Sequence, residues 1–159
     1  MLDSVVAEYE LPAEPSGDVR ADLTALAHQQ LGILRRHRWA LSLVITRPTL
    51  GPNGLRFLDH FLAVLAPTEL DGSAKLEAMA LFSGFVCQFA EWEHGGVSPG
   101  QDRLQAQREL AEYLGRAALT GQYPHLAANL AGRAAPADLD QLFARSLRRI
   151  LTAMLTPVN

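Results

Sequence analysis

The sequence predicts an all-α protein, and three features of its 159 residues support this fold class. Apolar residues recur at helical spacings of three and four positions, and no stretch shows the alternating pattern of a strand. The nine prolines and twelve glycines fall mainly between the periodic segments. The stretch 73–94 is apolar on two opposite helical faces, with no charged side chain between Glu77 and Glu91. One neighbouring helix cannot cover both faces, so we expect this helix at the centre of a domain or against a second subunit.

Six or seven helical segments are expected, and those of the first half are separated by proline and glycine. Residues 1–10 form a short first segment that ends before a loop rich in these two residues. Asp18 is expected to cap a long helix that finishes in the basic run 35–38, where cations suit the helix dipole. Residues 39–45 form a short apolar helix, and the proline and glycines of 51–54 open the next helix.

The second half continues the helical pattern. The two-faced helix 73–94 is stopped by a pair of glycines. Residues 98–101 have the form of a capping box with proline at the first helical position, which leads into a further helix. A short helix is expected within 123–132, and Pro136 starts a last helix with broad apolar coverage.

The length and composition bound the possible classes of protein. A chain of this length fits one domain over residues 1–159, and 48% hydrophobic residues are enough for a real core. A net charge of −3 lacks the basic footprint of a free-standing nucleic-acid binder. The single cysteine, Cys87, leaves no disulfide framework, which favours the cytoplasm. With no leader and no apolar run long enough for a bilayer, the protein is expected to be neither secreted nor bound to a membrane.

The sequence gives no sign of catalytic chemistry. Glu91 and His94 are spaced i, i+3 as in carboxylate metal sites, but one such pair supplies too few ligands. Motifs for a serine nucleophile and for a phosphate-cradling glycine loop are missing. We therefore expect no catalytic residue, no metal and no cofactor. A small helical enzyme or metal carrier remains the alternative from that class.

Two helices, 73–94 and the last one, carry more apolar surface than one core needs. Such helices are a natural pair for an intermolecular four-helix bundle, to which each subunit of a homodimer gives two. The residues expected at this dimer interface are Met79, Phe82, Val86, Leu139, Phe143, Leu147, Ile150 and Met154.

The order of these elements resembles the C-terminal domain of TetR-type transcriptional repressors. The resemblance is carried by the loop 46–49 after a short helix, the end 91–94 of the central helix and the final amphipathic helix, while 1–11 resembles the family's connecting helix. It implies a homodimer around an inducer pocket, with DNA bound by a separate helix-turn-helix domain. No stretch of this sequence has the pattern of such a helix-turn-helix domain. The chain is therefore expected to be the sensing and dimerising half, either truncated or made without its DNA-binding part.

Departures from the tetracycline-responsive members imply a small apolar effector. The family's metal-binding imidazole, connecting-helix histidine, drug-binding asparagine and water-holding carboxylate correspond to Leu43, Glu8, Leu26 and Ala90. Without those polar groups a magnesium-dependent ligand is disfavoured. The residues expected to line the pocket are His28, Trp39, Leu43, Arg47, Pro48, Phe57, His60, Phe61, Phe85, Phe89 and Trp92. From periodicity, ordinary hydrophobic core is the alternative for the apolar members of this set.

The resulting hypothesis is a domain that senses a small apolar molecule and would control an attached DNA-reading domain. The effector would favour one arrangement of the first helix and of segment 39–49. This would change the separation of the two attached DNA-binding domains in the dimer. The alternative is an interaction protein without a DNA-binding domain, which forms inactive mixed dimers with an intact regulator.

Overall fold

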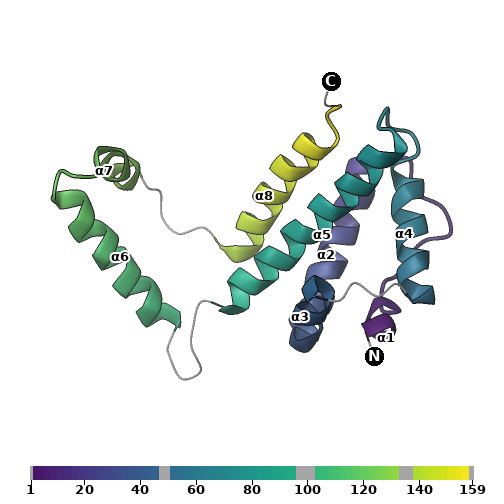
Figure 1. Cartoon of the computed structure of the whole chain (residues 1–159), viewed down its shortest axis with the longest axis horizontal. Helices are drawn as coiled ribbons and strands as arrows, with labels where there is room; N and C mark the ends of the chain where they lie inside the picture. The colour runs from purple at the N-terminus through teal and green to yellow at the C-terminus, as the bar shows by residue number, and fades with distance from the viewer. Residues whose placement is uncertain (1, 47–50, 96–102, 133–137, 158–159) are drawn as a thin grey trace. The chain divides into compact units, whose positions relative to one another are not determined.

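The protein is described by a computed structural model that covers residues 2–46, 51–95, 103–132 and 138–157. These residues contain helices and no strand, which confirms the predicted all-α fold class (Figure 1). The helices are α1 (Leu2–Val6), α2 (Val19–Arg36), α3 (Arg38–Thr46), α4 (Pro52–Val64), α5 (Gly72–Gly95), α6 (Arg103–Leu119), α7 (Pro124–Ala131) and α8 (Leu139–Met154).

Local sequence signals set several helix boundaries. The side chain of Asp18 accepts a hydrogen bond from the backbone N–H of Ala21 and so caps α2, as predicted. Pro52 stands at the start of α4, where a missing N–H costs no helical hydrogen bond. The first segment is shorter than expected, because α1 gives way to turns after Val6. The predicted capping box at 98–101 and the Pro136 start lie outside the described residues.

The chain divides into two compact units. The first comprises Met1–Glu91 and Phe143–Asn159, and so contains both ends of the chain; the second comprises Trp92–Leu142. Helices α5 and α8 therefore each have residues in both units. The expectation of one domain over 1–159 stays a prediction.

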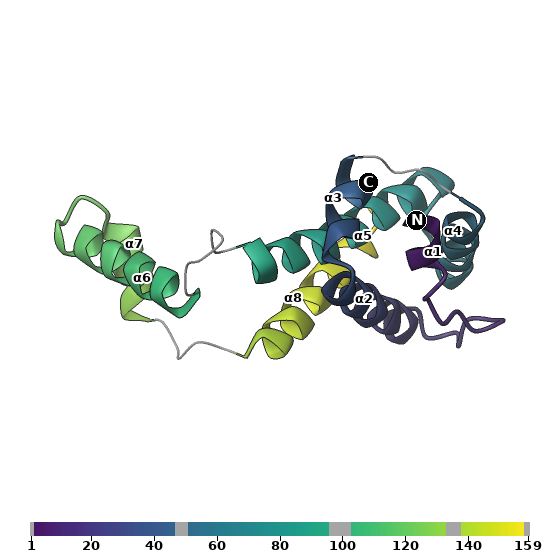
Figure 2. The ribbon, with the colours of Figure 1, turned by 90° about the horizontal axis from the view of Figure 1, so that it is seen from below.

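The first unit holds the hydrophobic core. Helix α1 packs on α3 and α4, and α2 packs on the same two helices. Helix α8 lies next to α5 (Figures 1 and 2), and rings from the two helices stack on each other. Among the described residues, every buried hydrophobic side chain belongs to this unit. The largest completely enclosed side chains are Phe61, Phe82 and Phe143, contributed by α4, α5 and α8.

The second unit contains α6 and α7, which pack on each other. The short helix predicted within 123–132 is confirmed as α7, which ends before Gly132. Four large apolar or aromatic side chains of this unit's described α6–α7 part are exposed: Leu110, Tyr113, Leu119 and Tyr123.

Candidate functional site

An aromatic cluster joins α2, α5 and α8 within the first unit. The Phe85 and Phe143 rings stack with centroids 5.5 Å apart. Phe89 meets Phe143 edge-on at 4.9 Å, and His28 does so at 5.2 Å. The structure thus brings together three residues predicted for the pocket, His28, Phe85 and Phe89. Phe143, predicted for the dimer interface, is at their centre.

A second aromatic row runs from the segment after α1 across α4 to α5. Tyr9 contacts Phe57 with ring centroids 4.5 Å apart, and Phe57 is followed by Phe61 at 6.2 Å. Phe61 then meets Phe82 of α5 at 5.1 Å. The predicted pocket residues Phe57 and Phe61 therefore share one row, which also takes in Tyr9 and Phe82. All four side chains are buried, so this row is filled by protein atoms.

The other predicted pocket residues are spread out. The indole of Trp39 is exposed and lies edge-on to the His37 ring at 6.2 Å. His60 is half-buried on α4. Trp92 is exposed and belongs to the second unit. The predictions for Arg47, Pro48 and the Leu43 side chain lie outside the described residues.

The residues predicted for the dimer interface are mainly core residues of the single chain. Phe82, Val86, Phe143, Leu147 and Met154 are each at most 6% exposed, and Met79, Leu139 and Ile150 are half-buried. The five buried side chains have little surface left for a second copy. In α8, Phe143, Leu147 and Met154 share one face, which is buried in the core of the first unit. The opposite face carries a shallow pocket lined by Arg145, Arg148, Arg149 and Thr152.

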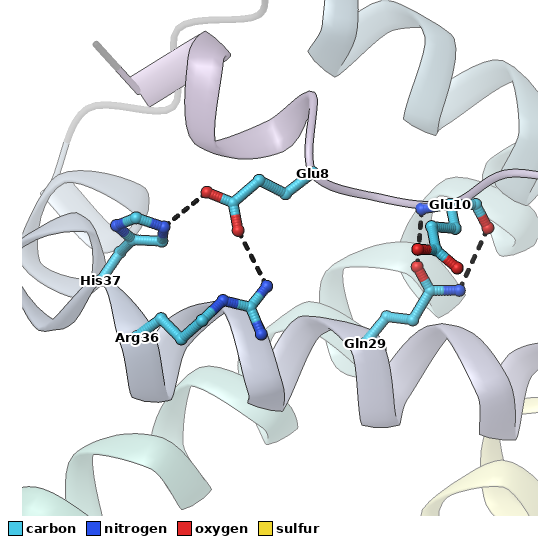
Figure 3. Close-up of polar contacts among 5 residues, drawn as sticks. All are labelled: Glu8, Glu10, Gln29, Arg36 and His37. Atoms are coloured by element: carbon cyan, nitrogen blue, oxygen red, sulfur yellow. Dashed lines mark hydrogen bonds and ion pairs between the residues drawn. The ribbon is translucent and has the colours of Figure 1, made fainter.

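The segment after α1 is fastened to α2 by polar contacts (Figure 3). The Glu8 carboxylate accepts a hydrogen bond from Arg36 Nη2 at 2.8 Å and also pairs with the His37 ring. Two turns earlier on α2, the Gln29 side chain forms two hydrogen bonds with the backbone of Glu10. The hydrogen bond from Arg36 is the main reason that the pKa of Glu8 lies below its usual value.

Asp3 of α1 caps the N-terminus of α4 from a distant point in the sequence. Its Oδ1 accepts from the backbone N–H groups of Asn53 and Gly54 at 3.0 and 3.1 Å, and its Oδ2 accepts from Asn53 Nδ2. The residue before α4, Gly51, has no side chain for this task, and a Cβ there would collide with the Asp3 carboxylate. Glycine at 51 therefore lets α1 approach α4 closely.

Gln30 is a buried polar residue that sequence reasoning missed. It is 6% exposed and lies in α2. Its Nε2 is 3.8 Å from Cys87 Sγ of α5, and its Oε1 is buried without a hydrogen-bond partner. Burial raises the pKa of the Cys87 thiol to about 11, so the thiol is protonated at neutral pH. A signal did exist in the sequence, because Gln30 interrupts the apolar face of α2 between Ala27 and Leu34.

Comparison with known proteins identifies the family. Residues 11–157 match the tetracyclin repressor-like C-terminal domain. The chain belongs to this family. The resemblance to TetR-type repressors, drawn from short segments of sequence, is thereby confirmed.

Two curated relatives are regulators of the same kind. An HTH-type transcriptional regulator of Saccharopolyspora erythraea is 33% identical over 86% of this chain and 54% of its own length. The HTH-type transcriptional repressor DrrR1 of Streptomyces coeruleorubidus is 29% identical over 97% of this chain and 58% of its own. The chain thus spans a little over half the length of the curated relatives that it matches.

Solved structures of the TetR family protein ActR from Streptomyces coelicolor share the fold. They cover 97% of this chain and 71% of their own, at 24% identity. The TM-score is 0.71 for apo ActR, 0.74 for ActR in complex with (S)-DNPA and 0.78 for ActR in complex with actinorhodin.

The described part of this TetR-type domain contains no group of three or more His, Cys, Asp and Glu residues that could hold a metal ion. Glu91 of the predicted i, i+3 pair is exposed on α5, and the side chain of His94 lies outside the described residues. In the same residues, no helix has both the length and the apolar character that a membrane crossing requires.

Proposed function

We propose that this chain is the ligand-sensing and dimerising domain of a TetR-type transcriptional repressor, with a small apolar effector. The observation that carries the proposal is the family match over residues 11–157. The curated relatives are named as transcriptional regulators, which supports a binding role and not a catalytic one. DNA would be bound by a helix-turn-helix domain elsewhere in a longer protein, and the complete regulator would act in the cytoplasm.

The first unit supports an effector site among its aromatic side chains. Phe85 is half-buried, and its ring contacts the rings of Phe143 and Phe89. The His28 ring contacts Phe143 as well. Such a cluster offers flat apolar surface with one polar group at its edge, which suits an aromatic ligand. Two solved ActR structures contain named small molecules, actinorhodin and (S)-DNPA. We extend small-molecule binding to this chain as part of the proposal.

The polar contacts of α1 support a route for the signal. Asp3 fastens the start of α1 to α4, and Glu8 fastens the segment after it to the end of α2. A ligand that moves α2 relative to α4 would therefore also move α1. Because a ligand shifts an equilibrium only through its different affinity for two arrangements, the effector must favour one placement of α1.

Calorimetric titration of the chain with 2-naphthol and with actinorhodin tests the proposal. We expect saturable binding of at least one of them at one molecule per chain. Phe85→Ala should weaken that binding about tenfold, because it removes the stacked ring. Leu55→Ala, at an exposed position of α4, should leave it unchanged. Melting curves of both unliganded variants verify that they fold. Absence of saturable binding by either compound would contradict the proposed function.

A further inference from the structure

Three arginines share the exposed face of α8 around a shallow pocket. Arg145, Arg148 and Arg149 line it together with Thr152, and its volume is about 460 Å³. That volume lies within the range of small-molecule sites. Arg145 stands three and four positions before the other two arginines, and like charges at this spacing repel each other on a helix. A bound anion would relieve this repulsion.

These arginines have no carboxylate to neutralise them within the described residues. None of the three takes part in an ion pair there. Residues 141–159 contain no Asp or Glu, so α8 offers no acidic side chain near them along the helix. The chain as a whole has a net charge of −3. The exposed face of α8 is therefore a local concentration of positive charge on an acidic protein.

A fourth arginine reaches this face from α2. Arg20 Nη1 donates a hydrogen bond to Thr152 Oγ1 at 3.1 Å. That hydroxyl in turn donates to the backbone carbonyl of Arg148 at 2.9 Å. A guanidinium group has five N–H donors, of which the contact with Thr152 uses one. Thr152 thus holds Arg20 at the edge of the pocket with donors left for a ligand.

We propose that this α8 pocket binds a small anion with two or more phosphate groups, held by Arg145, Arg148 and Arg149 together with Arg20. A guanidinium group matches phosphate oxygens with two parallel N–H donors. Arg145 and Thr152 are seven positions apart, which is about 10 Å along the helix axis. One phosphate group cannot contact both ends of such a pocket, whereas a chain of phosphates can.

The surroundings favour a small anion over duplex DNA. Asp18 and Asp22 stand two positions before and after Arg20 on α2. DNA carries phosphates along its whole length and would come close to these carboxylates, which repel it. The site is also separate from the aromatic cluster, because Phe143 lies on the opposite, buried face of α8. The inference therefore does not depend on the proposed function.

Calorimetric titration at low salt tests the site, with inorganic tripolyphosphate and orthophosphate as probes at equal ionic strength. We expect one tripolyphosphate to bind per chain, about tenfold more tightly than orthophosphate. The double change Arg145→Gln with Arg149→Gln should weaken tripolyphosphate binding about tenfold, because two guanidinium groups are lost. Arg20→Gln should weaken it about threefold, as expected for one contact at the edge of the pocket.

The control is the double change Arg108→Gln with Arg116→Gln, which removes the same charge from exposed positions of α6. It should leave the affinity unchanged, and melting curves verify that both double variants fold. No saturable binding of tripolyphosphate, or equal losses in the two double variants, would overturn the site and leave the proposed function standing.

Two further outcomes would assign the arginines to another partner and overturn the proposal. One is displacement of tripolyphosphate by a short DNA duplex of random sequence. The other is loss of a dimer, measured by light scattering, in the variant of Arg145 and Arg149. We expect neither outcome, because the pocket is small and bordered by carboxylates on α2.

Discussion

At the scale of single residues, polar side chains add to the apolar contacts that hold the first ten residues against α2 and α4. Glu8 pairs with Arg36 and His37 at the C-terminal end of α2, while Gln29 holds the backbone of Glu10. These contacts lie at the surface, where an ion pair contributes little to overall stability. Their effect is therefore on the position of a segment: they keep residues 8–10 against α2 when Glu8 is ionised.

The Glu8 contact predicts a dependence on pH. Folding lowers the pKa of Glu8 below its ordinary value of 4.5, so the folded chain binds this proton less readily than the unfolded chain. The Glu8 contact therefore makes its full contribution to the free energy of unfolding when the pH is above 4.5. That contribution is lost as the pH falls through the lower pKa that Glu8 has in the folded chain. Glu8→Gln should therefore reduce the urea midpoint at pH 7, and the reduction should be smaller at pH 3.

The control for this prediction is Glu14→Gln in the exposed loop before α2. It should show no difference from the unchanged chain at pH 7. An effect of Glu8→Gln that is the same at both pH values would show that the charge of Glu8 is not the source of its contribution.

At the scale of helices, α5 and α8 divide their apolar residues differently between the core and the surface. Helix α8 places Phe143, Leu147 and Leu151 in the core and three arginines outside. Helix α5 buries one face and exposes Leu76 and Leu81 on another. Helix α5 therefore leaves apolar residues on its exposed side, whereas α8 is an ordinary amphipathic helix.

The start of α4 depends on a residue from another helix. Asp3→Ala removes three hydrogen bonds at that helix end and should lower the free energy of unfolding by about 1 kcal/mol. The turn amides of Ala7 and Glu8 should then exchange hydrogen faster, because α1 has lost its attachment to α4. Urea unfolding and hydrogen-exchange mass spectrometry measure the two effects.

A cap of the ordinary local kind provides the control. Asp71 accepts from the backbone N–H of Ala74 at the start of α5. Asp71→Ala should have a comparable cost in stability and leave exchange near α1 unchanged. Unchanged exchange in both variants would mean that Asp3 does not hold α1 in place.

At the scale of the whole molecule, the exposed side of α5 is the candidate for contact with a second copy. Leu76 and Leu81 are each more than half exposed. The exposed residues Ala80 and Gly84 lie one turn apart on the same helix, Ala80 between the two leucines in sequence and Gly84 after them. Small residues at this spacing let the backbones of two helices approach closely, and the leucines supply apolar area. The homodimer predicted from the sequence stays a prediction, now with these exposed residues at its centre.

Light scattering on the chain and on Leu81→Lys tests this dimer. We expect a dimer for the unchanged chain and at least a tenfold weaker dimer for Leu81→Lys, because a lysine ammonium would lose its water at the interface. Leu55→Lys is matched in exposure, 54% against 53%, and should stay dimeric. A monomeric unchanged chain, or equal effects of the two lysines, would exclude this face of α5 as the interface.

The sequence by itself determined the helices, their order and the family resemblance. These features depend on local periodicity, on proline and glycine, and on caps within a few residues, as Asp18 shows for α2. Apolar spacing together with the family resemblance predicts Phe57, Phe61, Phe85 and Phe89 as members of one pocket set, which stays a prediction. The sequence could not divide that set between the cluster around Phe143 and the row from Tyr9 to Phe82.

Only the tertiary structure decided which polar groups meet. Asp3 reaches α4 across 50 residues of sequence, and Gln30 meets Cys87 across 57. It also decided that Phe82, Phe143 and Leu147 are enclosed by the chain itself, because an apolar stripe does not show which neighbour covers it. Helical spacing is a property of neighbouring residues, whereas burial and distant hydrogen bonds depend on how the helices pack together.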